Sequence, residues 1–325
     1  MPPIAIIIPF YQRKAGILAR SLDAVLAQTT LDGVAIHIVD DGSPIDPIDE
    51  IGRARAELGN DRITLHRKPN SGPGAARNYA LDRLREAEVV AFLDSDDRWP
   101  DCHIANIKGA ISRGGDLYFA DYRREGDAAS RFEQTAFAWE GMQIVDNLRE
   151  FAGDLFSLIL VNSPIGTPTV AYRFAAMSDL RFREGWRAGE DTLFWLQIAQ
   201  RARKVFFSPS DQVICGRGVN IFAGCEWGTI DDLVRLRHVV AFHMHVQRHF
   251  KLSAAQSRRN REWLAQLDHA FLLSFLSALR NRQPRCLSEL GGYVRDRPSS
   301  VLRLSAALRQ AASMLCDRRL KAFTR

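Results

Sequence analysis

The stretch VVAFLDSDDRWPD, from Val89 to Asp101, contains both the fold signal and the main polar cluster of this chain. Its first five residues are apolar, and an apolar run of this length predicts a buried strand. Three carboxylates, those of Asp94, Asp96 and Asp97, follow within four positions. Like charges at this spacing repel one another, and each carboxyl group is driven to hold a proton. We therefore expect a cation to bind at the end of this strand.

Short apolar runs alternate with helical periodicities on both sides of that stretch. Further strands are predicted within Ile4–Phe10, Val34–Ser43, Arg62–Arg67, Asp116–Tyr122, Thr167–Arg173 and Lys204–Ser208. Helices are predicted within Gly16–Gln28, Pro47–Leu58, Ser71–Ala87 and Gly189–Ala202, the last of them strongly amphipathic. This alternation is typical of an α/β fold in which helices cover both faces of a mostly parallel sheet.

From about Ile230 onward the periodicity is helical, with breaks at Pro284 and Pro298. We predict an α/β domain at residues 1–228 and a basic helical region at residues 229–325. From Lys251 to the end the chain holds 15 Lys/Arg and 5 Asp/Glu, whereas the preceding 250 residues hold 29 and 33. A basic helical region suits an anionic membrane surface, nucleic acid or a solvent-exposed extension. Because it has no motif with interleaved aromatics, we expect no nucleic-acid partner.

The bulk composition is ordinary for a globular protein, with 46% hydrophobic and 25% charged residues among 325. We find no basic start followed by an apolar run, and therefore expect no signal peptide. The longest apolar candidate, Phe271–Leu279, is too short to span a membrane. No CxxC pair occurs among the five cysteines, which we expect to be reduced thiols in the cytoplasm. They are Cys102, Cys215, Cys225, Cys286 and Cys316.

Polar residues also follow two other predicted strands: Tyr11 follows the first, and Asp40 and Asp41 follow the second. In a parallel α/β sheet, ligands bind beyond the carboxyl ends of the strands, so these residues and the three aspartates can form one site. Carboxylate oxygens favour Mg²⁺ or Mn²⁺, and such ions commonly bridge to phosphates. The alternative is a set of solvated acids at strand ends.

The segment SGPGAARN, Ser71–Asn78, is rich in glycine. A dinucleotide-binding loop would need a third glycine where Arg77 stands and would follow the first strand of the sheet. We favour a loop whose backbone and Arg77 approach a nucleotide. A glycine turn before a helix is the alternative for Gly72 and Gly74.

Glu190 and Asp191 stand at the start of a predicted helix, where the helix dipole favours acids. A carboxylate that faces a metal site is also a candidate general base. Four histidines occur together, and we favour a structural role because no acid motif accompanies them. They are His238, His243, His245 and His249. Three tryptophans, Trp186, Trp195 and Trp227, could stack on sugars, although we favour a core position for Trp195.

Taken in order, six segments resemble the family 2 glycosyltransferases. They are IIIPFYQR, LDAVLAQT, IHIVDDGS, NSGPGAARNYAL, AFLDSDDRW and GEDTLFWLQIA. The resemblance covers residues 4–202 and continues more weakly in GVNIFAGCEWG. That late segment and the helical tail are similar to bacterial exopolysaccharide glycosyltransferases of the succinoglycan type. The resemblance implies a Rossmann-like GT-A fold, a UDP-sugar donor, a divalent Mn²⁺ or Mg²⁺ ion and inversion at the anomeric carbon.

The resemblance also implies roles for individual residues. Asp41 would accept a hydrogen bond from the uracil ring, Asp191 would be the catalytic base and Glu190 would lie near the acceptor. The nucleotide would be bound by Pro9, Tyr11, Asp41, Arg77, Asp94 and Ser95. The metal would be held by Asp94, Asp96 and Asp97. The chain departs from the family at Arg217 and Gly218, where many relatives carry a histidine that is a third metal ligand.

We therefore predict an inverting glycosyltransferase that moves a sugar, expected to be glucose, from a UDP-sugar to a growing exopolysaccharide. The acceptor is expected to be a lipid-linked or free oligosaccharide, and the protein is expected to be held peripherally at the inner face of the plasma membrane. The donor sugar, the acceptor and the linkage position depend on the loops at residues 126–130 and 163–169 and on the helical tail. A non-catalytic nucleotide- or polysaccharide-binding regulator is the alternative, although it would be expected to lose the acids. A sugar nucleotidyltransferase would need a glycine-rich, lysine-bearing loop in place of PFYQRKAG.

Overall fold

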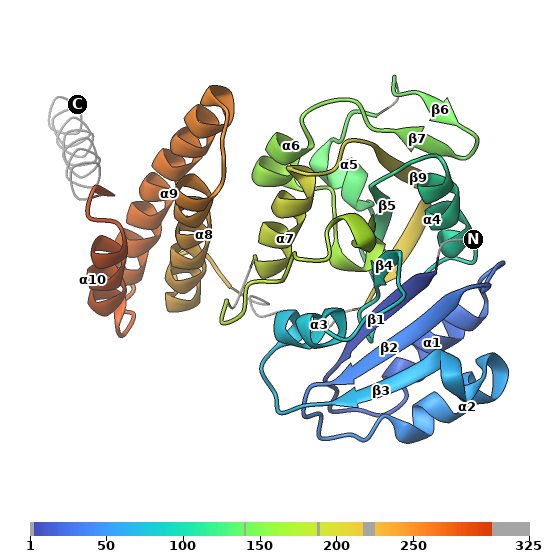
Figure 1. Cartoon of the computed structure of the whole chain (residues 1–325). Coiled ribbons are helices and arrows are strands. Elements are labelled where there is room, and N and C mark those ends of the chain that lie inside the picture. Colours follow the sequence, from blue (N-terminus) through green and yellow to red (C-terminus); the bar gives the residue numbers. More distant parts are fainter. Residues whose placement is uncertain (1–2, 140, 187–188, 217–224, 301–325) are drawn as a thin grey trace, which may run out of the picture. The chain divides into compact units, whose positions relative to one another are not determined.

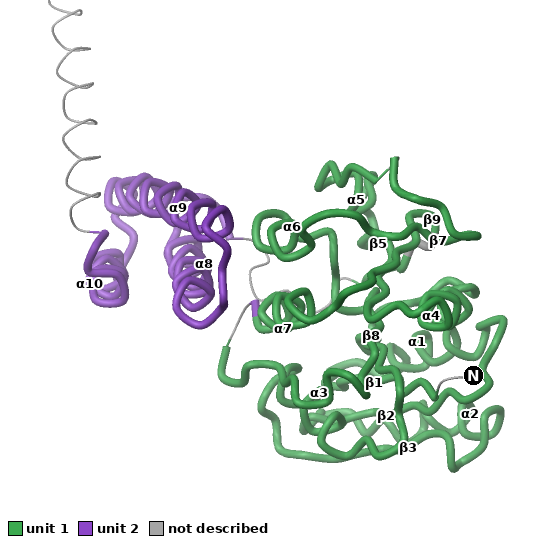
Figure 2. The backbone as a smooth tube through the Cα atoms, turned by 45° about the horizontal axis from the view of Figure 1, so that its top comes forward, with its two compact units in different colours: residues 1–186, 190–218 green, residues 187–189, 219–325 purple. Residues whose placement is uncertain are grey.

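The structure is a computed structural model that describes residues 3–139, 141–186, 189–216 and 225–300. The chain divides into two compact units (Figure 2). The first unit comprises residues 1–186 and 190–218, and the second comprises residues 187–189 and 219–325. The predicted boundary between residues 228 and 229 stays a prediction, as does the activity expected of residues 1–228.

In the described part of the chain, the first unit is built on one sheet with the strand order β3-β2-β1-β4-β8-β5-β9-β7-β6 (Figure 1). The strands are β1 (Ile4–Phe10), β2 (Val34–Asp40), β3 (Ile63–Arg67), β4 (Val89–Phe92), β5 (Leu117–Arg124), β6 (Ile144–Val145), β7 (Leu148–Glu150), β8 (Ala171–Arg173) and β9 (Val205–Cys215). Strands β3, β2, β1 and β4 run parallel to one another, and β5 runs parallel to β9. Strand β8 runs antiparallel between β4 and β5. The predicted α/β fold with a central, mostly parallel sheet is confirmed.

Helices cover both faces of this sheet (Figure 1). They are α1 (Ile17–Leu26), α2 (Ile48–Leu58), α3 (Pro73–Leu81), α4 (His103–Ser112), α5 (Arg131–Thr135), α6 (Leu155–Asn162) and α7 (Glu190–Ala199), with short 3₁₀ turns at Asn60–Arg62, Thr167–Thr169 and Phe174–Ala176. Alternate side chains of a strand point to opposite faces. Ile4, Ile6 and Ile8 of β1 accordingly share one core with α1, α2 and α4. Phe92 of β4 points the other way and packs against Phe194 of α7.

Three expectations about local structure need correction. The segment Thr167–Arg173 begins as a 3₁₀ turn, and only Ala171–Arg173 is a strand, because Pro168 has no N–H to give to a ladder. Strand β9 runs past Pro209 to Cys215, well beyond the predicted Ser208. Helix α7 is not amphipathic, since its residues 193–196 are all buried.

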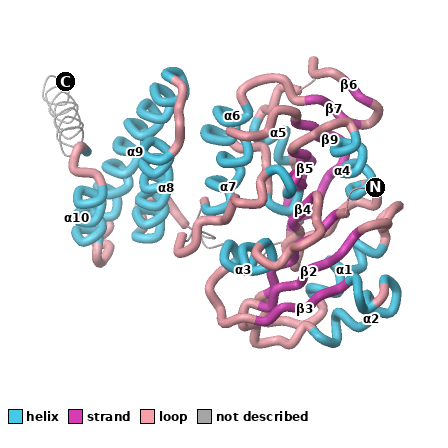
Figure 3. The backbone as a smooth tube through the Cα atoms, viewed as in Figure 1, coloured by secondary structure: helices cyan, strands magenta, loops and turns pink. Residues whose placement is uncertain are grey.

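In its described residues the second unit consists of helices α8 (Ile230–His249), α9 (Ala254–Arg280) and α10 (Cys286–Asp296) (Figure 3). The predicted breaks are confirmed, because α9 ends before Pro284 and α10 ends before Pro298. The helices share a core that includes Leu236, Phe271 and Tyr293. Within the described residues, no helix is long and apolar enough to cross a membrane.

Candidate active site

The carboxyl ends of β1, β2 and β4 lie side by side, and each continues into polar residues. Pro9 is half-buried near the end of β1, and Tyr11 beyond it is 38% exposed. Asp40, Asp41 and Ser95 are buried. The parallel arrangement therefore brings together the strand-end residues that the sequence pointed to.

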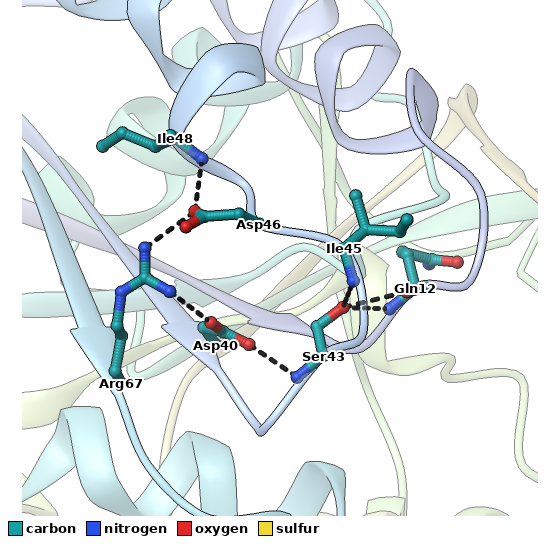
Figure 4. A network of polar contacts seen from close by, with 7 residues as sticks. All are labelled: Gln12, Asp40, Ser43, Ile45, Asp46, Ile48 and Arg67. Carbon is teal, nitrogen blue, oxygen red and sulfur yellow. Dashed lines mark hydrogen bonds and ion pairs between the residues drawn. The ribbon is translucent and has the colours of Figure 1, made fainter.

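Asp40 forms a closed polar network at the end of β2 (Figure 4). Its Oδ1 accepts the N–H of Ser43 at 2.8 Å, and its Oδ2 pairs with Arg67 Nη1 at 3.2 Å. The second nitrogen of the Arg67 fork donates to Asp46 at 2.7 Å. Ser43 Oγ in turn donates to the carbonyl of Gln12 at 2.9 Å, which ties this turn to the end of β1. Asp40 thus has a structural explanation that needs no ligand.

Asp41 fastens the loop between β3 and α3. Its Oδ1 accepts the N–H of Ser71 at 3.0 Å, and its Oδ2 accepts the N–H of Gly72 at 2.8 Å. The ammonium group of Lys68 also donates to Oδ1. Because a carboxylate has about four lone-pair positions, Asp41 can still accept a further hydrogen bond.

Arg77 lies at the centre of the site, buried on the first turns of α3. Its Nη2 donates to Asp94 Oδ1, and its guanidinium lies over the ring of Phe182 at 5.2 Å from the centroid. Burial alone would lower the pKa of Arg77, but the charges of Asp94, Glu190 and Asp191 together outweigh burial and raise it. Its Nε is buried without a hydrogen-bond partner in the described structure. The guanidinium is therefore held in place by charge.

The aspartates after β4 differ in exposure. The side chain of Asp94 is 31% exposed, whereas Asp97 is buried and accepts the N–H of Gly216 at 2.7 Å. Burial raises the pKa of Asp97 well above its usual value, and the charges of Asp94 and Asp96 raise it further. The repulsion expected from the sequence is therefore present at Asp97.

Helix α7 places Glu190 and Asp191 opposite this cluster. Phe194 stacks on Phe182 with ring centroids 4.0 Å apart, and Asn78 of α3 holds the backbone of Phe182 through two hydrogen bonds of 2.8 Å. A Cβ on Gly74 would lie 3.3 Å from Glu190, so the start of α3 is tightly packed against the start of α7. Asn78 is the residue in this arrangement that sequence reasoning missed.

The two acids of α7 have different surroundings. Burial, followed by the charge of Asp191, raises the pKa of Glu190 from 4.5 to about 7. Asp191 accepts the hydroxyl of Thr167 at 3.4 Å and the N–H of Thr192 at 2.6 Å. Glu190 can therefore hold a proton near neutral pH, which limits the negative charge on the pair.

The model of glycosyl transferase family 2 matches residues 5–180, more than half of the chain. The chain belongs to glycosyltransferase family 2. It is therefore an enzyme that transfers sugars.

Individual glycosyltransferases extend the comparison. The chain is 31% identical over 241 residues to the succinoglycan biosynthesis protein ExoW of Rhizobium meliloti, covering 68% of this chain and 71% of that protein. It resembles S. aureus TarS 1-349 in complex with UDP-GlcNAc, with a TM-score of 0.54 and 16% identity over 95% of this chain and 92% of that one. It also resembles the mannosyltransferase PcManGT of Pyrobaculum calidifontis in complex with GDP-Man and Mn²⁺, with a TM-score of 0.60 and 17% identity over 95% and 86%. A longer TarS structure is spanned to only about half its length, 53%. At these identities the solved structures support the GT-A fold alone.

The glycosyltransferase has a small polar cavity of about 100 Å³ at the carboxyl end of β5. Tyr122, Arg124, Asp127, Arg131 and Gln134 line it. Arg131 donates from Nε and Nη2 to the carbonyl of Ser163, at 2.9 and 2.7 Å, which joins the loops at residues 126–130 and 163–169. Burial, the largest cause, raises the pKa of Tyr122 to about 12, although the charges of Arg131 and Arg124 lower it. Sequence reasoning identified the loops but missed these side chains.

A divalent ion is the cofactor that the family implies. Among the described residues, no group of three or more His, Cys, Asp or Glu side chains is arranged to hold an ion by itself. The oxygen donors after β4 nevertheless suit Mg²⁺ or Mn²⁺, which are commonly held by one or two carboxylates together with substrate phosphates. The mutual repulsion around Asp97 is what such an ion would relieve. The departure at Arg217 and Gly218 lies outside the described residues.

The histidines and one tryptophan have structural positions. His243 is buried, with its Nδ1 2.7 Å from Asn260 Oδ1, and burial lowers its pKa to about 4. The rings of His245 and His249 stack on each other with centroids 4.1 Å apart. Trp195 is 1% exposed and lies in the core. The structural role predicted for His243 and the core position predicted for Trp195 are confirmed.

Proposed function

We propose that this glycosyltransferase moves glucose from UDP-glucose to a growing, lipid-linked exopolysaccharide, with inversion at the anomeric carbon. The observation that carries the proposal is that one buried guanidinium, that of Arg77, interacts both with an acid that we assign to the donor and with two acids that we assign to the acceptor side. Asp94, beyond β4, accepts a hydrogen bond from it, and Glu190 and Asp191, at the start of α7, act on the same guanidinium through their charges. The names of ExoW and of the TarS complex support the polysaccharide and the UDP parts of the proposal.

We assign the donor side to the strand ends. Asp41 accepts from the uracil ring through a lone pair that the loop leaves free, with Pro9, Tyr11 and Arg77 around the base. Asp94 and Ser95 bind the ribose, and Asp94, Asp96 and Asp97 provide the oxygens for Mn²⁺ or Mg²⁺. Bound there, the ion would neutralise the diphosphate and so make UDP a better leaving group. The Mn²⁺ of the PcManGT complex supports this choice of cofactor.

We assign the proton transfer to Asp191. Its carboxylate accepts the proton of the acceptor hydroxyl as the hydroxyl oxygen bonds to the anomeric carbon and the bond from that carbon to UDP breaks. A single displacement of this kind inverts the anomeric centre. Glu190, whose raised pKa lets it hold a proton, lies beside the acceptor and limits the charge around the base.

We place the acceptor near the cavity lined by Tyr122, Arg124 and Arg131. Tyr122 would also be 2.8 Å from a Cβ on Gly166, next to the Thr167 hydroxyl that contacts Asp191. An acceptor bound there has its hydroxyl close to the base. The basic second unit supports peripheral contact with an anionic membrane at the cytoplasmic face, where a lipid-linked acceptor is held.

The test is release of nucleotide from a panel of UDP- and GDP-sugars with Mg²⁺, Mn²⁺ or EDTA. We expect metal-dependent UDP release from UDP-glucose and a loss of at least about a hundredfold in Asp191→Asn, the range of general-base contributions. Asp96→Ala is the control for the metal, and Glu57→Gln, on the exposed side of α2, is the control for a surface change. No release together with no UDP binding by calorimetry would contradict the proposal and favour a non-catalytic regulator.

A further inference from the structure

The turn between α9 and α10, residues 279–287, is an unusual surface of the second unit (Figure 1). It presents three exposed arginines, Arg280, Arg282 and Arg285. None of the three forms an ion pair with another described residue. The sequence contains no acid between Asp268 and Glu289. Three other arginines among the described residues of this unit do form ion pairs: Arg235 with Asp232, Arg237 with Glu289 and Arg297 with Asp268.

Two of these arginines occupy backbone positions that favour glycine. Arg282 has φ 53° and follows the end of α9, where the N–H of Gln283 bonds to the carbonyl of Ala278 at 2.9 Å. This is the helix-ending motif in which glycine is the usual residue at the left-handed position. Arg285 has φ 64° immediately before α10. Both side chains therefore stand where the backbone alone would select a residue without a Cβ.

Exposed leucines occupy the two ends of this turn. Leu279 is 46% exposed and Leu287 is 67% exposed, and both are among the most exposed large apolar residues described. Arginine beside exposed leucine is a combination suited to a lipid surface, where the charge meets anionic headgroups and the leucine enters the boundary with the acyl chains. A nucleic-acid backbone would match the charges but would leave the leucines in water.

We propose that the α9–α10 turn is the element that binds an anionic lipid bilayer, through Arg280, Arg282 and Arg285 with Leu279 and Leu287. This inference rests on the proposed function, which includes peripheral contact with an anionic membrane. It adds the surface of the protein that makes this contact. It requires no particular position of the two units, because the whole surface belongs to the helical unit.

The test is flotation of the full chain with vesicles of phosphatidylcholine alone or mixed with phosphatidylglycerol. The double variant Arg282→Gly/Arg285→Gly removes two charges at positions where glycine is the residue that the backbone prefers, so its unfolding temperature should equal or exceed that of the wild type. Each basic residue near an anionic bilayer contributes about 1 kcal/mol to binding, so the loss of two costs about 2 kcal/mol. Because 1.4 kcal/mol is a factor of ten, we expect the partition of this variant onto anionic vesicles to fall about thirtyfold.

The matched control is Arg258→Gln/Arg259→Gln, which removes two exposed charges near the other end of α9. We expect it to bind anionic vesicles like the wild type, and we expect neither protein to float with neutral vesicles. Leu279→Ser/Leu287→Ser should weaken the binding that remains at high salt, where the charges are screened.

Three results would overturn the proposal: unchanged flotation of the glycine double variant, an equal loss in the control, or tighter binding of a DNA or RNA oligonucleotide than of anionic vesicles. UDP release without vesicles is measured on the same variants. If the wild type releases no UDP, the result counts against the proposed function. If the wild type releases UDP but does not float with anionic vesicles, the result counts against this inference alone.

Discussion

Two acid groups of the glycosyltransferase unit, one after β2 and one after β4 and at the start of α7, differ in how their charge is balanced. Asp40 and Asp41, after β2, are balanced by Arg67, Lys68 and three backbone N–H groups. Beyond β4 and at the start of α7, five carboxylates are grouped around one buried guanidinium, that of Arg77. Burial is the main cause of the raised pKa values of Asp97 and Glu190, and the neighbouring carboxylates raise them further. The charges of the first group are balanced by other groups of the protein. In the proposed function, a cation and a substrate would balance those of the second.

The largest effect is expected when Arg77, the buried cation that the described residues place in the second group, is removed. Arg77→Met leaves Asp94, Glu190 and Asp191 without their shared partner, and breaking a buried ion pair from one side typically costs 3–5 kcal/mol. Because Asp94 is partly exposed, we expect a loss of about 3 kcal/mol in the free energy of unfolding. Urea unfolding measures it, with Arg85→Met, an exposed residue, as the control. A loss no larger than that of the control would show that the acids are balanced in another way.

A smaller effect is expected in the first group. Asp41→Asn keeps one oxygen acceptor and loses the charge that faces Lys68, so the N–H of Ser71 or Gly72 loses a charged acceptor. Leaving one such buried donor poorly satisfied costs about 1–3 kcal/mol. Unfolding in urea at neutral pH measures the loss, and the exposed Asp46→Asn should unfold like the wild type. Equal stability of the two variants would contradict the view that Asp41 fastens this loop.

The smallest effect depends on pH and concerns Glu190. Its pKa is about 7 in the folded chain and about 4.5 when unfolded, so the folded state binds the proton more tightly. Stability is then lost as pH rises above the lower value, and the loss is complete above the higher one. We expect Glu190→Gln to gain stability relative to the wild type between about pH 5 and pH 8, by the order of 1 kcal/mol once residual exposure is allowed for. The measurement is thermal unfolding in EDTA at several pH values. A constant difference between the two proteins would show that Glu190 titrates normally.

The sequence predicted the first half of the fold well because β1 and β4 are continuous apolar runs and β2 is mostly apolar, as expected for strands that are largely buried on both faces. It predicted the second half less well. Strand β9 includes Pro209 and polar residues, and it passes an irregularity in its pairing with β5 near Ala120, a pattern that is typical of a loop when only the sequence is seen. Strand β8 is three residues long and takes its place only through pairing with β4 and β5.

The residues of the site were predicted from local sequence motifs, whereas the contacts between them were not. Asp41, Asp94 and Asp191 stand in segments that the sequence identified by themselves. The contact of Arg77 with Asp94 and that of Gly74 with Glu190 join different elements, so no local pattern contains them. The double hydrogen bond of Asn78 to Phe182 spans 104 positions and has no signal in the sequence. The sequence therefore identified the segments that hold these residues, whereas it did not identify their partners.

The central claim is that the acids around Arg77 carry charge that a divalent ion is needed to balance. Calorimetry of UDP binding, with Mn²⁺ and with EDTA, tests it most directly. We expect Mn²⁺ to tighten UDP binding by at least about tenfold, or 1.4 kcal/mol, and Asp96→Asn to remove that gain while Asp46→Asn keeps it. Equal affinity for UDP in Mn²⁺ and in EDTA would contradict the account.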